Sequence, residues 1–309
     1  MSRVLAMFLA VFAMGTMAVA APVKSGRMEV NGINYYYEIH GIGPRAKPGV
    51  TKAAAGMTNP PLLLLHGGLG SIDMFGPVLN ELAKTRKVIA VDLQGHGRTP
   101  LTDRPFSLEA IGDDMATIVK KLGHEQVDVM GYSLGGGIAF RMAVQQPQSV
   151  RRLVIASAGY SDEGYFPELR QQQNAVGAVM AEQMKGTPMY ESYMRLAPKK
   201  EDFPRLLDTL GNFMRAKYDY SADVAKLKGP VMLVFADADM YKLEHVMKFY
   251  QLLGGGLKDA GWQREHMSKN RLAIIPDQTH YDLFLSPRLV PTVLPFLDGK
   301  SPTSAWAAK

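Results

Sequence analysis

Short apolar runs alternate with amphipathic segments along most of this 309-residue chain. A continuous apolar run of four to eight residues is typical of a strand that is buried on both faces of a sheet. The predicted buried strands cover residues 61–66, 87–92, 127–132, 152–157, 231–235 and 272–275. The predicted helices cover residues 71–85, 107–122, 135–146, 241–253 and 287–297. This alternation predicts an α/β fold, a mostly parallel sheet with helices on both faces.

Two regions depart from the alternation. Near the N-terminus, residues 28–30 and 33–39 read as strands joined by an Asn31-Gly32 hairpin turn. Between residues 159 and 228 no buried strand is expected, and several short helices rich in Met, Tyr and Phe are predicted instead. We therefore expect a core of residues 21–158 and 229–300 that carries a helical cap of residues 159–228. Residues 41–59 and 254–270 are expected to be loops.

The Met and aromatic side chains of the predicted cap suggest an adaptable apolar pocket. The alternative is that most of them only pack the cap onto the core. The side chains in question are Tyr160, Tyr165, Met180, Met184, Met189, Tyr190, Tyr193, Met194, Phe213 and Met214.

The first twenty residues have the pattern of a secretory signal peptide. Arg3 precedes the apolar stretch 4–19, and small residues end it just before Ala21-Pro22. Cleavage is expected after Ala20, which makes the mature protein exported, periplasmic or secreted if the source is bacterial. An uncleaved membrane anchor is the alternative. No later segment is apolar for long enough to span a bilayer, so no stable membrane insertion is expected after cleavage.

Composition excludes several kinds of chemistry. The chain contains no cysteine, which removes thiolate zinc sites, iron–sulfur clusters and cysteine nucleophiles. The formal net charge of +6 is spread along the chain without a long basic block, so no nucleic-acid partner is expected. The seven histidines lack metal-ligand spacing, and no glycine-rich loop has the lysine of a phosphate site. Neither a metal nor a cofactor is predicted.

The motif most informative about function is Gly131-Tyr-Ser133-Leu-Gly135, a G-x-S-x-G placed between a predicted strand and a predicted helix. A serine on so tight a turn adopts a strained backbone, and the residues two positions away on either side must lack bulk. The helix that starts behind Ser133 offers unpaired N–H groups and the positive end of its dipole. Both favour the oxyanion that forms during acyl transfer.

These residues make the chain resemble the α/β-hydrolase superfamily, and most closely its serine esterases and lipases with a helical cap. Residues 65–70 are similar to the family's oxyanion loop, residues 92–99 to the loop after its fourth strand, and residues 131–135 to its nucleophile elbow. The resemblance implies the chain order Ser, Asp, His for the catalytic residues. Ser133, Asp239 and His280 follow that order. It also implies oxyanion donors at the backbone N–H groups of Gly68 and Leu134.

Elimination supports the choice of His280, because it alone follows the last predicted strand. An imidazole suits the role since it can take the hydroxyl proton and return it to the leaving group. His66 and His96 lie in family loops and are expected to hold those loops. The remaining histidines look like surface or helix residues: His40, His124, His245 and His266.

Two aspartates compete with Asp239 for the orienting role. Asp237 lies two residues earlier, and Asp162 follows the strand at 152–157, where some family members place their acid. We prefer Asp239, because the family's motif puts the acid at the end of this short loop.

The sequence thus predicts an exported serine hydrolase that cleaves small-molecule carboxylic esters through an acyl-enzyme on Ser133. Lactone hydrolysis, carbon–carbon bond hydrolysis or cofactor-free perhydrolysis on the same residues is the alternative. A non-catalytic ligand-binding protein of the same fold is a hypothesis of another class. The acyl and alcohol groups of the substrate and the oligomeric state are not readable from the sequence.

Overall fold

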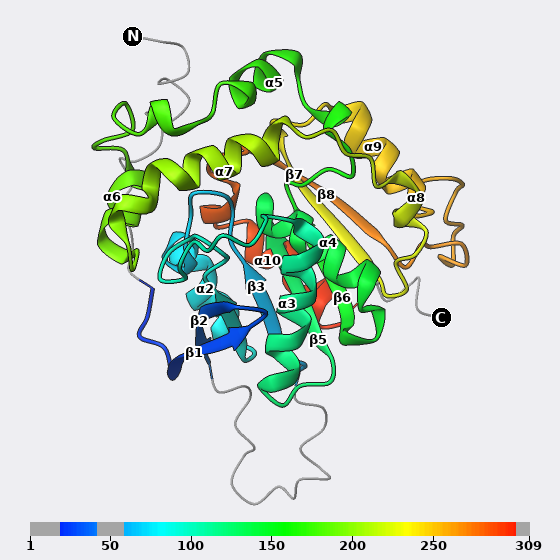
Figure 1. Ribbon diagram of the computed structural model, residues 1–309. Coiled ribbons are helices and arrows are strands. Elements are labelled where there is room, and N and C mark those ends of the chain that lie inside the picture. The colour runs from blue at the N-terminus through cyan, green and yellow to red at the C-terminus, as the bar shows by residue number, and fades with distance from the viewer. Residues whose placement is uncertain (1–18, 42–58, 301–309) are drawn as a thin grey trace, which may run out of the picture.

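The computed structural model describes residues 19–41 and 59–300 (Figure 1). The described part contains one eight-stranded sheet of order β1-β2-β4-β3-β5-β6-β7-β8. β1 pairs antiparallel with β2, and β2 pairs antiparallel with β4. From β4 to β8 all neighbouring strands pair parallel. The strands are β1 Lys24–Val30, β2 Ile33–His40, β3 Leu62–Leu65, β4 Val88–Val91, β5 Val127–Tyr132, β6 Val150–Ala156, β7 Val231–Ala238 and β8 Arg271–Thr279.

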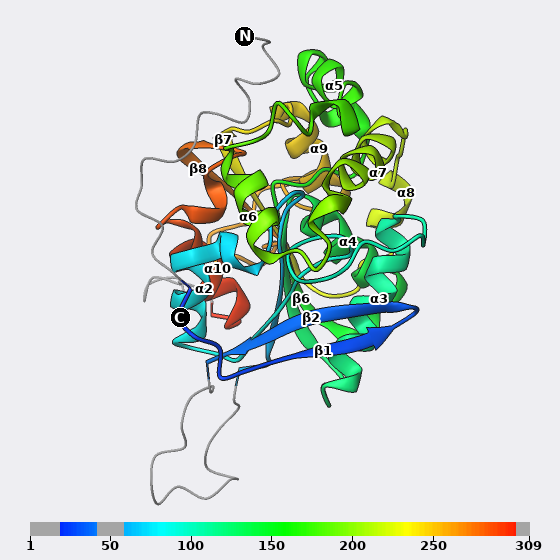
Figure 2. The same cartoon turned by 60° about the vertical axis from the view of Figure 1, so that its left-hand side comes forward.

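Helices cover both faces of this sheet (Figure 2), which confirms the predicted α/β fold. The side chains of β3 alternate between two apolar clusters. Leu63 and Leu65 pack in the cluster that contains α3 Leu108–Lys121, α4 Leu134–Gln145 and α9 Leu243–Leu252. Leu62 and Leu64 pack in the cluster on the opposite face, with α2 Gly76–Ala83 and α10 Leu289–Leu297. Because all four leucines are buried on one face or the other, the strand sequence shows no polar alternation.

The Asn31-Gly32 turn joins β1 to β2. Both residues have positive φ, 48° and 78°, as a two-residue hairpin of this kind requires. Val30 and Ile33 therefore pair directly at the start of the ladder.

The segment predicted as the cap, residues 159–228 and here called the cap segment, contains helices and isolated bridges but no strand. Its principal helices are α5 Pro167–Asn174, α6 Pro188–Leu196, α7 Phe203–Arg215 and the short α8 Ser221–Val224. In Figure 1, α5, α6 and α7 lie over the carboxyl ends of the parallel strands. The α7 side chains Phe203, Leu206, Leu207 and Leu210 repeat at helical spacing and are buried in a third apolar cluster.

Some expectations were wrong in detail. His40 lies on β2, not on a helix or the surface; it is 3% exposed, and its Nε2 is 2.8 Å from Glu38 Oε2. The helix expected at 71–85 is a 3-10 turn, Ile72–Phe75, followed by α2. Gly76, which ends the 3-10 turn and begins α2, has φ of 40°, a conformation that a continuous helix does not contain.

The last two strands run beyond their apolar runs. β7 extends to Ala238 and β8 to Thr279, and most of the added residues are exposed or half-buried, so apolar patterning did not reveal them. Residues 1–18 of the predicted signal peptide and 42–58 of the predicted loop lie outside the described residues. Over residues 19–41 and 59–300, no helix combines the length and apolar character needed to cross a bilayer.

Candidate active site

Ser133 occupies the turn between β5 and α4 with φ of 53° and ψ of −119°. The turn is possible only because its flanking residues lack side chains. A Cβ at Gly131 would lie 2.0 Å from the Gly135 carbonyl oxygen, and a Cβ at Gly135 would lie 2.3 Å from the Leu65 carbonyl oxygen. The glycines thus allow a strained backbone that presents the Ser133 hydroxyl at the end of the strand.

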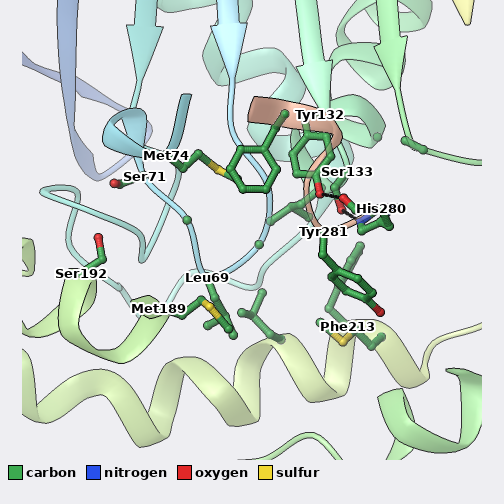
Figure 3. A pocket seen from close by; sticks show the side chains of 18 of the residues that line it. Leu69, Ser71, Met74, Tyr132, Ser133, Met189, Ser192, Phe213, His280 and Tyr281 are labelled. Atoms are coloured by element: carbon green, nitrogen blue, oxygen red, sulfur yellow. Dashed lines mark hydrogen bonds between the residues drawn. The ribbon is translucent and has the colours of Figure 1, made fainter. Parts of the chain in front are cut away.

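His280, directly after β8, connects Ser133 to Asp239. Its Nε2 is 3.0 Å from Ser133 Oγ (Figure 3). Its Nδ1 is 3.0 Å from Asp239 Oδ1. The Tyr132 hydroxyl donates a hydrogen bond to the His280 carbonyl oxygen, and the two rings lie 5.3 Å apart. The three predicted residues are therefore brought together in one line of contacts.

Asp239 is buried, which by itself disfavours its charged form. Hydrogen bonds from His280 and from the Ser157 hydroxyl, together with the backbone N–H of Ala236, outweigh that penalty and hold the pKa of Asp239 below its ordinary value. The N–H of Met240 donates at 2.8 Å to Asp239 Oδ1, the oxygen that also faces His280. Asp239 is therefore a fixed carboxylate that faces the imidazole.

Sequence reasoning missed Ser157. It is fully buried directly after β6 and has a positive φ of 50°. Its backbone N–H donates to the Val234 carbonyl oxygen at 2.8 Å, so the residue is held on both its backbone and its side chain. A lone serine at the end of a predicted strand carries no sequence signal for this contact.

The rival aspartates lie elsewhere. Asp237 is exposed and accepts the Gln278 N–H at 3.1 Å, and backbone N–H groups lower its pKa. Asp162 accepts the Tyr218 N–H at 3.1 Å and forms an ion pair with Arg170 at 3.1 Å. Within residues 19–41 and 59–300, neither carboxylate forms a hydrogen bond with His280.

Both predicted oxyanion donors border the same cavity as Ser133. A Cβ at Gly68 would meet only Leu134 Cδ2 at 3.9 Å, whereas a Cβ at Gly67 would lie 2.8 Å from the Tyr132 ring. Within residues 19–41 and 59–300, the N–H groups of Gly68 and Leu134 donate to no acceptor. The arrangement leaves two N–H groups unpaired beside the Ser133 hydroxyl, as an anion site requires.

His66 ties the Gly68 loop to the loop that follows β4. The Leu93 N–H donates to His66 Nε2 at 3.0 Å, which leaves Nδ1 to donate to the Gly67 carbonyl oxygen at 2.8 Å. Burial lowers the pKa of His66 to about 3 and that of neighbouring His96 to about 4. Both rings are therefore neutral and hold loops, as the sequence suggested.

A cavity of about 1150 Å³ lies between the sheet and the cap segment, with Ser133 and His280 in its wall. Of the cap side chains predicted for a pocket, six border it: Tyr165, Met180, Met184, Met189, Phe213 and Met214. The other four do not: Tyr160, Tyr190, Tyr193 and Met194. No group of three or more His, Asp or Glu side chains is placed to hold a metal ion in the described part of the chain.

Comparison with known proteins agrees with this geometry. The family model for the alpha/beta hydrolase fold matches residues 60–250, and the chain belongs to this family. The 2-hydroxymuconate semialdehyde hydrolase of Pseudomonas sp. strain CF600 is 39% identical over 106 residues, 33% of this chain and 38% of that protein. The curated relatives that the chain matches are aligned over less than half of their own length.

Solved structures share the fold at low sequence identity. A thermophilic esterase from Thermogutta terrifontis superposes with a TM-score of 0.64 at 20% identity, covering 91% of this chain and 99% of the esterase. The enol-lactonase of Burkholderia xenovorans LB400 gives a TM-score of 0.62 at 17% identity, with coverage of 88% and 100%. The chain is accordingly a hydrolase-family protein related to bacterial hydrolases and esterases.

Proposed function

We propose that this protein hydrolyses carboxylic esters through an acyl-enzyme formed on Ser133. The observation that carries the proposal is the line of contacts from Ser133 Oγ through the His280 ring to the Asp239 carboxylate, at the edge of a large cavity. A hydroxyl, an imidazole and a carboxylate in this order are the parts of a nucleophile activated by a general base.

In the first half-reaction, His280 Nε2 accepts the Ser133 proton while Oγ attacks the ester carbonyl carbon. The carbonyl oxygen becomes an oxyanion, and the N–H groups of Gly68 and Leu134 stabilise it. Asp239 accepts a hydrogen bond from Nδ1 and stabilises the imidazolium without taking the proton. His280 then gives the proton to the alcohol oxygen, and the bond from the carbonyl carbon to that oxygen breaks.

In the second half-reaction, water replaces the alcohol. His280 accepts a proton from the water as it attacks the acyl carbonyl, and the tetrahedral intermediate collapses with return of a proton to Ser133 Oγ. The products are a carboxylic acid and an alcohol.

A carbon–carbon bond hydrolase is the second candidate, and the similarity to 2-hydroxymuconate semialdehyde hydrolase favours it. Lactone hydrolysis is a third outcome on the same residues, in line with the fold of the enol-lactonase. Steady-state kinetics on a panel of esters, lactones and vinylogous β-diketones distinguishes these reactions. The ester proposal expects the highest kcat/KM on an open-chain ester.

The test of the hydrolase itself is turnover of p-nitrophenyl acetate by wild type and Ser133→Ala. We expect the substitution to lower kcat by at least about a thousandfold while the fold stays intact, because only oxyanion binding remains. Circular dichroism controls for folding. A Ser133→Ala protein that turns over at the wild-type rate contradicts the proposal.

We also propose that residues 1–20 are a signal peptide and that the mature chain starts at Ala21. The support is the sequence pattern of Arg3, the apolar stretch and the small residues at the cleavage site. N-terminal sequencing of the protein from its native source tests this. Recovery of Met1 in the membrane fraction would favour the anchor.

A further inference from the structure

Tyr281 follows His280 in the chain, and its side chain borders the same cavity. Its ring lies edge-on to the His280 ring, with centroids 5.5 Å apart and planes at 76°. The side chain is half-buried in the cavity wall. Figure 3 shows the ring reaching from beside His280 toward Phe213, with the hydroxyl at the far end. Tyr281 therefore places a polar atom in a part of the cavity that aromatic carbon borders.

The Tyr281 hydroxyl has hydrogen-bonding capacity that the protein does not use. Other tyrosines of the cavity wall are paired: Tyr241 donates to Tyr165 at 2.8 Å, and Tyr132 donates to the His280 carbonyl oxygen. Within residues 19–41 and 59–300, the Tyr281 hydroxyl has no such partner. Burial and the nearby Asp239 charge raise the pKa of Tyr281 to about 12, so the phenol keeps its proton and remains a donor.

The chemistry of the proposed reaction assigns Tyr281 to one half of the substrate. His280 Nε2 has to reach the alcohol oxygen in order to protonate it, so the alcohol half of an ester lies against the imidazole. The acyl oxygen points instead toward Gly68 and Leu134. We therefore expect Tyr281, whose ring packs T-shaped against the His280 ring and borders the cavity, to contact the alcohol half.

We propose that Tyr281 is a specificity-determining residue that favours esters whose alcohol half carries an oxygen acceptor, such as an ether or carbonyl. Its hydroxyl donates a hydrogen bond to that acceptor, several atoms from the scissile bond. The inference rests on the proposed ester hydrolysis and deepens it by naming the class of alcohol. It assigns Tyr281 no role in bond breaking.

Matched butyrate esters test the proposal. One series has n-alkyl alcohols of increasing length, and in the other an ether oxygen replaces one methylene at successive positions. The measured quantity is the ratio of kcat/KM for each ether to kcat/KM for its hydrocarbon counterpart, in wild type and in Tyr281→Phe. At the best position we expect the wild-type ratio to exceed the variant's by roughly threefold to tenfold, the range of a neutral hydrogen bond.

Tyr165→Phe is the matched control, because it also removes a phenol oxygen from the cavity wall but one that already has a partner. Its ether-to-alkyl ratio should equal that of wild type. Hydrolysis of the common butyryl-enzyme, measured by single-turnover kinetics, should not distinguish ether from alkyl esters, since the alcohol has left.

Equal ratios in wild type and Tyr281→Phe at every ether position would overturn the inference while Ser133-dependent turnover continued. A loss of the ratio in Tyr165→Phe as well would assign the effect to the shape of the cavity and also overturn it. If neither ester series showed turnover that depends on Ser133, the proposed ester hydrolysis itself would fail. The two failures are therefore distinguishable.

Discussion

The loops at the carboxyl ends of the strands and the cap segment border the same cavity, but they constrain their residues differently. At the turn around Ser133, Gly131 at the end of β5 and Gly135 at the start of α4 have no room for a Cβ, and in the loop after β7 Asp239 is held by several hydrogen bonds. In the cap segment the side chains that border the cavity include Met180, Met184 and Met214. Unbranched thioethers adapt to many shapes and tolerate exchange. Reaction chemistry is therefore fixed by the loops, whereas the shape of the cavity is set by a more replaceable surface.

The largest effect on kcat is expected from substitution of Asp239, the carboxylate that faces His280. Asp239→Asn should lower kcat by about a thousandfold to ten-thousandfold near neutral pH, because an amide favours the wrong imidazole tautomer. Asp162→Asn, in the cap segment, should change kcat by less than about tenfold, since Asp162 pairs with Arg170 away from His280. Kinetics on one ester measures both effects, with folding checked by circular dichroism. A large loss of kcat in Asp162→Asn, with Asp239→Asn near wild type, would contradict the assignment of reaction chemistry to the loops.

A second test compares two fully buried leucines, Leu63 in β3 and Leu207 in α7. Truncation of either to Ala should cost about 2–5 kcal/mol of local or global stability, because each leaves a cavity. We expect Leu63→Ala to accelerate hydrogen exchange throughout the sheet and Leu207→Ala to accelerate it mainly in the cap segment. Hydrogen-exchange mass spectrometry measures this. Equal acceleration across the sheet in both variants would show that the cap segment and the core unfold as one unit.

A smaller effect is expected from the buried histidines of the core loops, which make the free energy of unfolding depend on pH. Burial lowers the pKa of His66 to about 3 and of His96 to about 4, below the ordinary value of about 6.5. As pH falls below 6.5, the unfolded state binds protons that the folded state does not, so the free energy of unfolding decreases. Asp92 acts in the opposite direction, because burial raises its pKa to about 6, despite hydrogen bonds and a charge contact from Arg98. The two histidines outweigh it.

Urea unfolding at several pH values measures the slope of the free energy of unfolding against pH. Between pH 5 and 6, His96→Asn should reduce the slope by up to about 1.4 kcal/mol per pH unit, whatever the variant's absolute stability. His124→Asn is the comparison: burial and the nearby Lys87 charge lower the pKa of His124 less strongly, because it is only half-buried, so a smaller reduction of the slope is expected. An unchanged slope in His96→Asn would mean that His96 takes up a proton in the folded state.

The sequence was sufficient to predict the sheet, its faces and the contacts of Ser133, His280 and Asp239. Four consecutive leucines cannot face water, and a serine between two glycines after a buried strand has few alternative structures. Ser157 and Tyr281 were not predicted. The role of Ser157 depends on a long-range hydrogen bond to Asp239, and that proposed for Tyr281 depends on the cavity that its side chain borders. Neither residue type is unusual in a loop.

In the cap segment, the sequence did not indicate which side chains line the cavity. Its helices are amphipathic and its composition indicated an apolar pocket, but periodicity does not reveal which side chains border the cavity. Met184 and Tyr193 are both buried in the same apolar cluster, yet only Met184 borders the cavity. That difference depends on how α6, which carries Tyr193, and the turn before it, which carries Met184, sit on the core. The side-chain pattern alone leaves this open.

The central claim is that the core loops alone make the Ser133 hydroxyl reactive. Incubation with a small fluorophosphonate, followed by intact-mass measurement and peptide mapping, tests it most directly. The account predicts one phosphonyl group on Ser133 with release of fluoride, no label in Ser133→Ala, and much slower labelling in Asp239→Asn. An unlabelled wild-type protein, or a label on a serine other than Ser133, would contradict it.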